Sequence, residues 1–237
     1  MTESEITAVV VDRLDGEQLV LDGLGLARAF FHGDPSSVGN NSFDALAGRG
    51  DPNMITTSDL QTINRRMRAR SSPDHWVTVL DRHLDSLAAI DSALDLISSD
   101  AEEWAAANGE ELARRAFGAV IAPHRGLSVA TKILHLKRPR FFPVLDALVM
   151  TMAGINMPTD ATPTRRIETA MVLLLHLREQ GRRNLDSLRA IQGALREEGI
   201  DRSLLRVFDA ILWFSHPAAG VAGTSRQFTI SAGAGPS

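Results

Sequence analysis

Apolar residues at helical spacing recur along almost the whole chain, and this pattern constrains the fold more than any other feature. Intervals of three and four residues place apolar side chains on one face of a helix. They predict helices over residues 17–31, 58–68, 75–97 (as one helix or two), 110–121, 129–136, 163–180, 184–198 and 201–216. Alternation with a period of two is scarce, and its best case, Thr7–Val11, fits either a short strand or the beginning of the first helix. The sequence therefore predicts an all-α fold class.

The predicted helices follow one another without an internal repeat or a linker. We therefore expect a single α-helical domain over residues 1–216, with a degenerate hairpin at 123–146. A chain of 237 residues is long enough for one such domain with a sizeable core. Residues 217–237 are rich in Gly, Ala and Ser and offer little to bury, which predicts a flexible, disordered tail.

Composition excludes several classes of protein. The chain has no cysteine, which rules out disulfides and cysteine-ligated metal sites and fits a reducing cytosol. No basic cluster marks a secretory signal and no apolar run is long enough to span a bilayer, so we expect a cytoplasmic protein with no membrane partner. The histidines are scattered: His83 and His32 each have one nearby acid and lack further ligands. We expect no metal and no cofactor.

One segment, Arg125 to Val149, carries most of the functional information. Gly126 predicts a turn, Ser128 can cap the helix that follows, and Pro139 ends that helix. Phe141 and Phe142 are expected in the core. Pro143 is expected to introduce the next helix, with Asp146 in its first turn.

Basic residues are concentrated in the first part of this segment, where residues 124–140 contain no acid. The net charge of −4 gives no general attraction to nucleic acid, so a local patch of this kind is required for binding. A solvated helix face paired with carboxylates is the alternative. The predicted nucleic-acid-binding residues are Arg125, Gly126, Ser128, Lys132, Lys137, Arg138 and Arg140.

Gly126, Ala130 and Asp146 stand in a spacing that resembles the helix-hairpin-helix DNA glycosylase superfamily. The resemblance implies a DNA-glycosylase-like helical fold, a turn whose backbone N–H groups bind a DNA phosphate, and a catalytic role for Asp146. That aspartate would stabilise the sugar cation or activate water during cleavage of the glycosidic bond. Capping of a helix N-terminus is the alternative role for this carboxylate.

The segment also departs from the superfamily pattern. His124 replaces the first glycine of the turn, and Ser128 stands where lyase-type members carry a nucleophilic lysine. Cluster cysteines are absent, and no second catalytic carboxylate can be matched. These departures argue against a Schiff-base mechanism and leave open whether the protein is an enzyme.

Three stretches, one of which lies within the segment described above, resemble an uncharacterised bacterial family, domain of unknown function 6308. They cover residues 43–60, the segment from Ala130 to Asp146, and Leu205 to Trp213. This resemblance spans most of the chain but names no activity. In the last stretch, Arg206 and Asp209 are expected to form a surface ion pair, and Trp213 is expected in the core.

Three functions remain open at this point. The first is a nucleic-acid-binding domain with DNA as its partner. The second is a monofunctional N-glycosylase that acts on DNA bases through Asp146, and the third is a non-catalytic structural or protein-interaction domain. They differ in one geometric expectation: binding or catalysis requires the turn at Gly126 and the acid at Asp146 to open onto one basic groove.

Overall fold

The computed structural model describes residues 6–32, 43–122, 125–156 and 161–217. The predicted tail, apart from Pro217, and His124 of the predicted hairpin lie outside these residues. Helices dominate the described part, and a two-stranded antiparallel sheet accompanies them. In chain order the elements are β1 (Ala8–Asp12), β2 (Gln18–Asp22), α2 (Gly23–His32), α4 (Thr57–Met67), the 3-10 turn η1 (Pro73–Trp76), α5 (Asp85–Ala88), α6 (Ala101–Ala106), α7 (Gly109–Val120), α8 (Leu127–Lys137), α9 (Ala147–Met152), α10 (Pro163–Arg183), α11 (Leu185–Glu197) and α12 (Leu204–Ser215).

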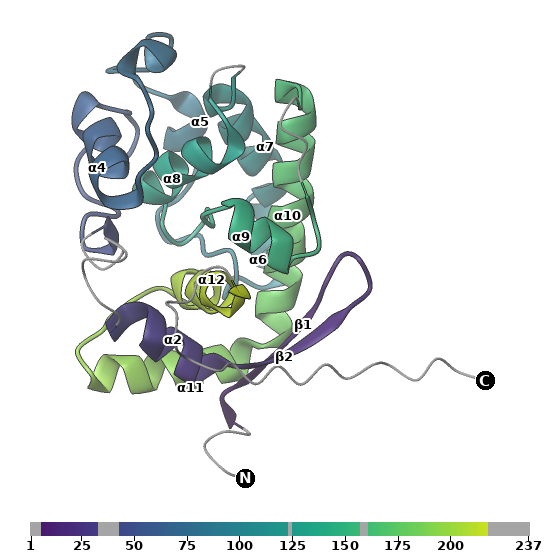
Figure 1. Cartoon of the computed structure of the whole chain (residues 1–237). Helices are drawn as coiled ribbons and strands as arrows, with labels where there is room; N and C mark the ends of the chain where they lie inside the picture. Colours follow the sequence, from purple (N-terminus) through teal and green to yellow (C-terminus); the bar gives the residue numbers. More distant parts are fainter. Residues whose placement is uncertain (1–5, 33–42, 123–124, 157–160, 218–237) are drawn as a thin grey trace.

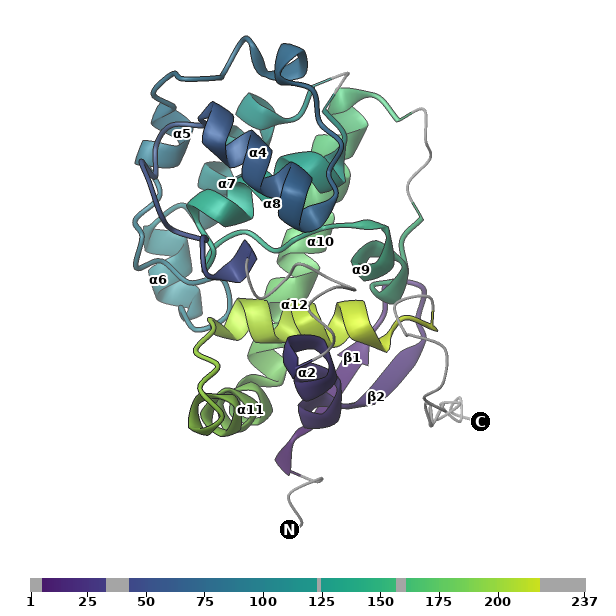
Figure 2. The same cartoon turned by 60° about the vertical axis from the view of Figure 1, so that its left-hand side comes forward.

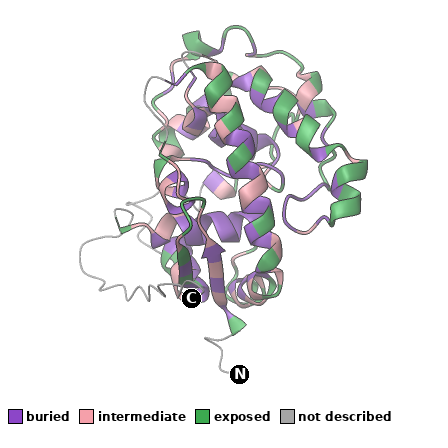
Figure 3. Cartoon of the chain, turned by 90° about the vertical axis from the view of Figure 1, so that its right-hand side faces the viewer, coloured by how far each residue is buried: buried purple, intermediate pink, exposed green. Residues whose placement is uncertain are grey.

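The elements form two halves joined by one long helix, α10 (Figures 1 and 2). Helices α4, α5, α7 and α8 gather in one half, and α2, α11 and the sheet gather in the other. Helix α10 runs along both halves, and α12 lies across the middle of the molecule. Buried residues are concentrated on α12 and on the inner faces of the surrounding helices (Figure 3). The core is continuous through both halves.

The sheet corrects the all-α expectation. Within the range predicted as the first helix, residues 18–22 form β2, because Leu19 and Leu21 face the core while their neighbours point outward. This alternation fits a pleated strand paired with β1 and not a helix. The alternative left open for residues 7–11 is also decided, because β1 covers Ala8–Asp12.

The free edge of β1 is covered by side chains of α10. Asn184 Oδ1 accepts from the Val10 backbone N–H at 2.8 Å, and its Nδ2 donates to the Val10 carbonyl at 2.7 Å. Gln180 Oε1 accepts from the Asp12 N–H at 3.0 Å. These amides take the place of a third strand and protect the edge from pairing with another chain.

The long helix predicted over residues 75–97 is wrong. The structure has η1, the four-residue helix α5 and turns in this range, interrupted by Asp81 at φ +54°. Trp76, Leu87, Ile90, Leu94 and Ile97 of this range are buried, whereas Val77 is exposed, so the expected burial is correct for part of the range although the helix is not. The turns keep their shape because side chains from α8 bind their carbonyl groups, as described below.

Several helix boundaries also differ from expectation. The capping box of α4 consists of Thr56 and Asp59, so the helix begins at Thr57, one residue before the predicted residue 58. Gly126 is the N-cap of α8 and no side chain caps that helix, so the predicted cap by Ser128 is wrong. Helix α9 begins at Ala147, immediately after Asp146. The burial of Phe141 and Phe142 is confirmed.

Candidate functional site

Arg138 and Lys137, at the end of α8, point into the molecule. The Arg138 guanidinium donates to the carbonyls of Leu87 and Pro52 at 2.7 Å and to Ile90 at 3.1 Å, and it also binds Asn53 Oδ1 and the Lys137 carbonyl. These bonds hold the turns that replace the predicted long helix. The side chain is buried and its donors are occupied by the protein itself.

Lys137 ends inside the same region. Its ammonium group lies 2.5 Å from Asp59 Oδ2 and donates to the Asp51 carbonyl at 3.0 Å, and the side chain is 1% exposed. Asp59 is also the residue that completes the capping box of α4. Lys137 therefore links the end of α8 to the beginning of α4.

Arg125 and Lys132 are buried as well. Arg125 donates to the carbonyls of Val120 and His75, both at 2.6 Å, and stacks over Trp76 at 5.2 Å. Lys132 Nζ donates to the Met67 carbonyl at 3.3 Å. Burial lowers the pKa of Lys132, while the carboxylates of Asp146 and Asp209 act in the opposite direction.

Arg140 is the exception in the basic segment. Its Nε donates to Asp95 Oδ2 at 3.1 Å, and half of the side chain is exposed. Gly126 and Ser128 are partly exposed at the beginning of α8. The structure thus directs four of the five basic side chains inward, to protein acceptors, and does not assemble them on one face. Contact of this segment with nucleic acid stays a prediction.

Asp146 caps helix α9. Its Oδ1 accepts from the backbone N–H groups of Leu148 and Val149 at 3.0 and 3.1 Å, and its Oδ2 accepts from the indole Nε1 of Trp213 at 2.9 Å. Three hydrogen bonds from the protein therefore occupy both oxygens. The capping role accounts for this geometry, and a catalytic role for Asp146 stays a prediction.

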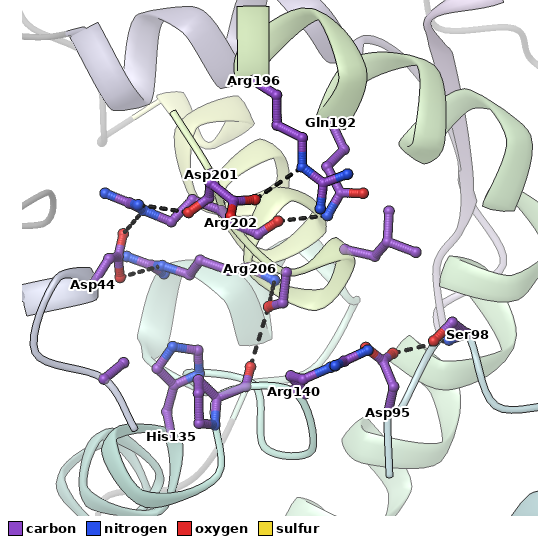
Figure 4. Close-up of a pocket in the computed structure, with 14 residues that line it drawn as sticks. Asp44, Asp95, Ser98, His135, Arg140, Gln192, Arg196, Asp201, Arg202 and Arg206 are labelled. Atoms are coloured by element: carbon purple, nitrogen blue, oxygen red, sulfur yellow. Dashed lines mark hydrogen bonds and ion pairs between the residues drawn. The ribbon is translucent and has the colours of Figure 1, made fainter. Parts of the chain in front are cut away.

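A polar pocket of about 380 Å³ opens where the two halves of the molecule meet (Figure 4). Its wall comes from five places: the segment at Asp44, the loop at Asp95, the end of α8, the outer part of α11, and the beginning of α12. The charged residues of the lining are Asp44, Asp95, Asp201, Arg140, Arg196, Arg202 and Arg206. With His135 neutral, the lining carries one formal positive charge in excess.

The pocket is backed by a buried ion network that corrects the expected surface pair. Arg206 Nη1 contacts Asp209 Oδ2 at 2.5 Å, and its Nε contacts Asp44 Oδ1 at 2.7 Å. Burial raises the pKa of Asp209 to about 7, against the lowering effect of Arg206. The spacing alone did not reveal the burial, because only tertiary packing places α12 in the centre of the fold.

His135 belongs to the pocket wall and is fully buried. Its Nδ1 lies 2.7 Å from the Phe142 carbonyl, and since a carbonyl only accepts, Nδ1 carries the proton. Burial, assisted by the charge of Arg206, lowers the pKa of His135 to about 4. The ring is therefore neutral near pH 7, and Nε2 presents a lone pair.

A second basic feature lies on the surface at the last turn of α4 and in the residues that follow it. Arg65, Arg66, Arg68 and Arg70 are all exposed, and none of their side chains makes an ion pair or hydrogen bond with another described residue. We call these four residues the arginine loop. Sequence reasoning missed it, although residues 60–73 contain four arginines and no acid, which is a readable signal.

The arginine loop is held at both ends. Asn64 Nδ2 donates to the Ser71 carbonyl at 2.7 Å, and the Ser71 N–H donates to Asn64 Oδ1 at 2.8 Å. Ser71 Oγ in turn accepts from the buried indole of Trp76 at 2.7 Å. Arg68 and Arg70 adopt φ of 50° and 52°, a left-handed conformation that is uncommon outside glycine. The chain reverses here in a defined shape and exposes its four guanidinium groups.

Two searches over the described residues gave negative results. No group of three or more His, Asp or Glu side chains there is arranged to hold a metal ion. Of the helices in the described ranges, none combines the length and the apolar character needed to cross a bilayer.

The chain matches the model of a family described as "Family of unknown function (DUF6308)" over residues 24–216. No curated protein and no solved structure matches it. The matched range contains the arginine loop, the pocket and Asp146. The resemblance of the central segment to DNA glycosylases receives no support from these comparisons.

Proposed function

Because the chain belongs to the DUF6308 family, whose description names no activity, we propose a function from the structure: the protein binds the phosphate backbone of nucleic acid through the arginine loop. The observation that carries this proposal is the group of four exposed arginines, within six residues, that lack acidic partners in the described part of the chain.

Charge is the first argument. Some exposed arginines of this chain are paired with a carboxylate, as Arg114 is with Glu168 at 2.7 Å. The arginine loop keeps all four charges available in a chain whose net charge is −4. Guanidinium groups bind phosphate oxygens in a bidentate manner, which favours arginine over lysine for this purpose.

Preorganisation is the second argument. The hydrogen bonds between Asn64 and Ser71 fix the ends of the loop, so little backbone entropy is lost when a partner binds. Arg68 ends α4 in the left-handed conformation that is common at helix C-termini, whereas Arg70 adopts it beyond the helix end, where it costs free energy and is concentrated at sites with a function. These features support a binding surface more than a solvated helix end.

The burial of the apolar face of α4 favours nucleic acid over a membrane surface as the partner. Leu60 and Ile63 are buried in the core, so the helix presents no apolar stripe that could enter a bilayer. An arginine loop without exposed apolar neighbours is suited to tracking a phosphate backbone. Anionic vesicles serve as the comparison in the experiment.

Fluorescence anisotropy with labelled 20-nucleotide single- and double-stranded DNA tests the proposal. We expect binding at low salt whose affinity falls as salt rises. Replacing all four loop arginines with glutamine should weaken binding about tenfold or more and reduce the salt slope by roughly 3, since each phosphate contact contributes about 0.7–0.9. Folding of the variant is checked by circular dichroism.

The control removes four other exposed arginines, so that the net charge changes equally. Suitable positions on α7, α10 and α11 are Arg114, Arg115, Arg165 and Arg189. Equal losses for the two quadruple variants, or no salt-dependent binding by the wild-type chain, contradict the proposal, as does tighter binding to anionic vesicles than to DNA. If Arg140→Gln or Ser128→Ala weakens DNA binding and the quadruple loop variant binds as the wild-type chain does, the contact lies on the predicted hairpin instead.

A further inference from the structure

A second and independent inference concerns the pocket between the two halves of the molecule. We propose that it binds a small phosphorylated molecule that carries hydroxyl groups, of the sugar phosphate class. This site is separate from the arginine loop, because none of the four loop arginines belongs to its wall.

Donors for an anion are present at the mouth. Arg140 and Arg196 use only Nε for their aspartate partners, Asp95 and Asp201, at 3.1 and 2.9 Å. Their terminal Nη groups make no hydrogen bond within the described ranges, and both side chains are more than half exposed. Two guanidinium groups held at Nε are oriented, yet they keep the atoms that bind a phosphate in a forked geometry.

The beginning of α12 adds to this positive environment. Ser203 and Leu204, its N-cap and first residue, lie in the pocket wall. The N-terminal end of a helix carries a partial positive charge and favours an anion. Figure 4 shows Arg196, Arg202 and Arg140 around the same opening, contributed by α11, the turn before α12 and the end of α8.

The inner end of the pocket contains buried polar atoms without hydrogen-bond partners. Asp44 Oδ2, Arg206 Nη2 and Arg202 Nε are such atoms among the described residues. Arg202 Nε lies 3.6 Å from Asp44 Oδ2, which is an ion pair but too long for a hydrogen bond. Buried polar groups are normally satisfied, because leaving one unpaired costs free energy. All three atoms belong to residues of the pocket wall, so this end of the pocket has hydrogen-bonding capacity that a polar ligand can use.

The protonation of His135 indicates which groups a ligand can present to this end of the pocket. With Nδ1–H fixed on the Phe142 carbonyl, the ring offers Nε2 only as an acceptor. Asp44 Oδ2 is also an acceptor, and its side chain is 2% exposed. The inner end therefore has the donors Arg206 Nη2 and Arg202 Nε beside these two acceptors, and a hydroxyl group, which both donates and accepts and remains neutral, can partner either kind of atom. The opposite end binds the anion, so the ligand combines a phosphate with hydroxyl groups.

The size of the pocket agrees with a small molecule. Its volume of about 380 Å³ is near the lower limit of ligand sites in proteins, roughly 300–1,000 Å³. It lies where two structural halves meet, which is a common place for such sites. None of the loop arginines lines it, so this site and the arginine loop are proposed to serve different ligands.

Calorimetric titration of the full chain with ribose 5-phosphate, inorganic phosphate and ribose tests the inference. We expect ribose 5-phosphate to bind most tightly, inorganic phosphate more weakly, and ribose alone not to bind. Arg140→Ala should weaken binding of both phosphates about tenfold or more, because it removes a charged hydrogen-bond donor. Because half of the Arg140 side chain is exposed, we expect this variant to fold. Arg65→Ala, in the arginine loop, is the matched control and should leave the affinity unchanged.

The hydroxyl end is tested by two substitutions at His135. Asparagine places a donor near the position of Nδ1 and lacks Nε2, whereas glutamine retains a polar atom near Nε2. His135→Asn should remove the preference for ribose 5-phosphate over inorganic phosphate, and His135→Gln should retain part of it. Circular dichroism confirms that both variants fold.

Three results overturn the inference. One is the absence of saturable binding of either phosphate to the wild-type chain at millimolar concentration. Another is wild-type affinity in Arg140→Ala, and the third is equal affinity of the wild-type chain for ribose 5-phosphate and inorganic phosphate. Since the DNA-binding experiment uses other residues and another ligand, failure of one proposal leaves the other unaffected.

Discussion

Trp213 donates a hydrogen bond from its indole Nε1 to Oδ2 of Asp146 at 2.9 Å, which joins the C-terminal part of α12 to the N-cap of α9. The other oxygen of the same carboxylate caps α9. One side chain therefore fixes both the beginning of a helix and its contact with its neighbour. This double role makes Asp146 a structural residue in the described fold, whatever further chemistry it supports.

Asp146→Ala should lower the free energy of unfolding by about 2 kcal/mol, because a cap is lost and an indole N–H loses its acceptor. Asp146→Asn should lose less, since asparagine is also a good N-cap. A double-mutant cycle with Trp213→Phe in urea denaturation should give a coupling of ~1 kcal/mol. Additive effects of the two substitutions would contradict the importance of this bond.

Arg138→Ala should be among the most damaging single substitutions, with a loss of about 3–5 kcal/mol, comparable to breaking a buried charged interaction. Five acceptor oxygens would be left without their donor, those of Pro52, Asn53, Leu87, Ile90 and Lys137. The matched control is Arg140→Ala, two residues away and half exposed, which should change stability by less than about 1 kcal/mol. Chemical denaturation of both variants measures the difference. Similar midpoints for the two would refute the assigned role of Arg138.

His135 should make the protein sensitive to acid. Its pKa is lowered to about 4 in the folded chain, below the ordinary value of 6.5, so the unfolded chain binds a proton first as pH falls. The stability that depends on neutral His135 is complete above pH 6.5 and is lost as pH falls through about 4.

The size of this effect follows from the shift. Between pH 7 and pH 4, the contribution of His135 to the loss of stability should be on the order of 3 kcal/mol. His135→Asn should lose correspondingly less stability over that interval, whatever its stability at pH 7. Urea denaturation at both pH values for both proteins measures this, and equal losses would show that His135 is not the titrating group.

Two glycines should respond in opposite directions to substitution by alanine. Gly154 has φ +83°, and an added Cβ would lie 2.8 Å from the backbone nitrogen of Asp15 in the turn of the β-hairpin. Gly154→Ala should therefore cost ~2 kcal/mol or more. Gly118 lies within α7 with open space around it, so Gly118→Ala should stabilise by up to about 1 kcal/mol. Thermal denaturation distinguishes the two, and stabilisation by both would mean that the hairpin turn does not pack on Gly154.

Local sequence predicted the elements whose stability is largely local. The C-terminal helices, the helix over residues 110–121 and the helix ended by Pro139 agree with the structure within a few residues. Their amphipathic spacing and their terminal residues are properties of single segments. The strand β2 and the turns after η1 were predicted as helices, because their form depends on partners outside the segment itself: the neighbouring strand β1 in one case and the distant Arg138 in the other.

The sequence by itself determined which residues are apolar, where helices can begin and end, and that residues 60–73 and 124–140 are basic without acids. Only the tertiary structure decided which of those two basic segments faces solvent. Arg125, Lys132, Lys137 and Arg138 find carbonyl and carboxylate partners inside the fold, whereas the arginine loop does not. The physical reason is that a charge can be buried only where acceptors from distant segments converge on it, and convergence is a property of packing that spacing along a chain does not contain.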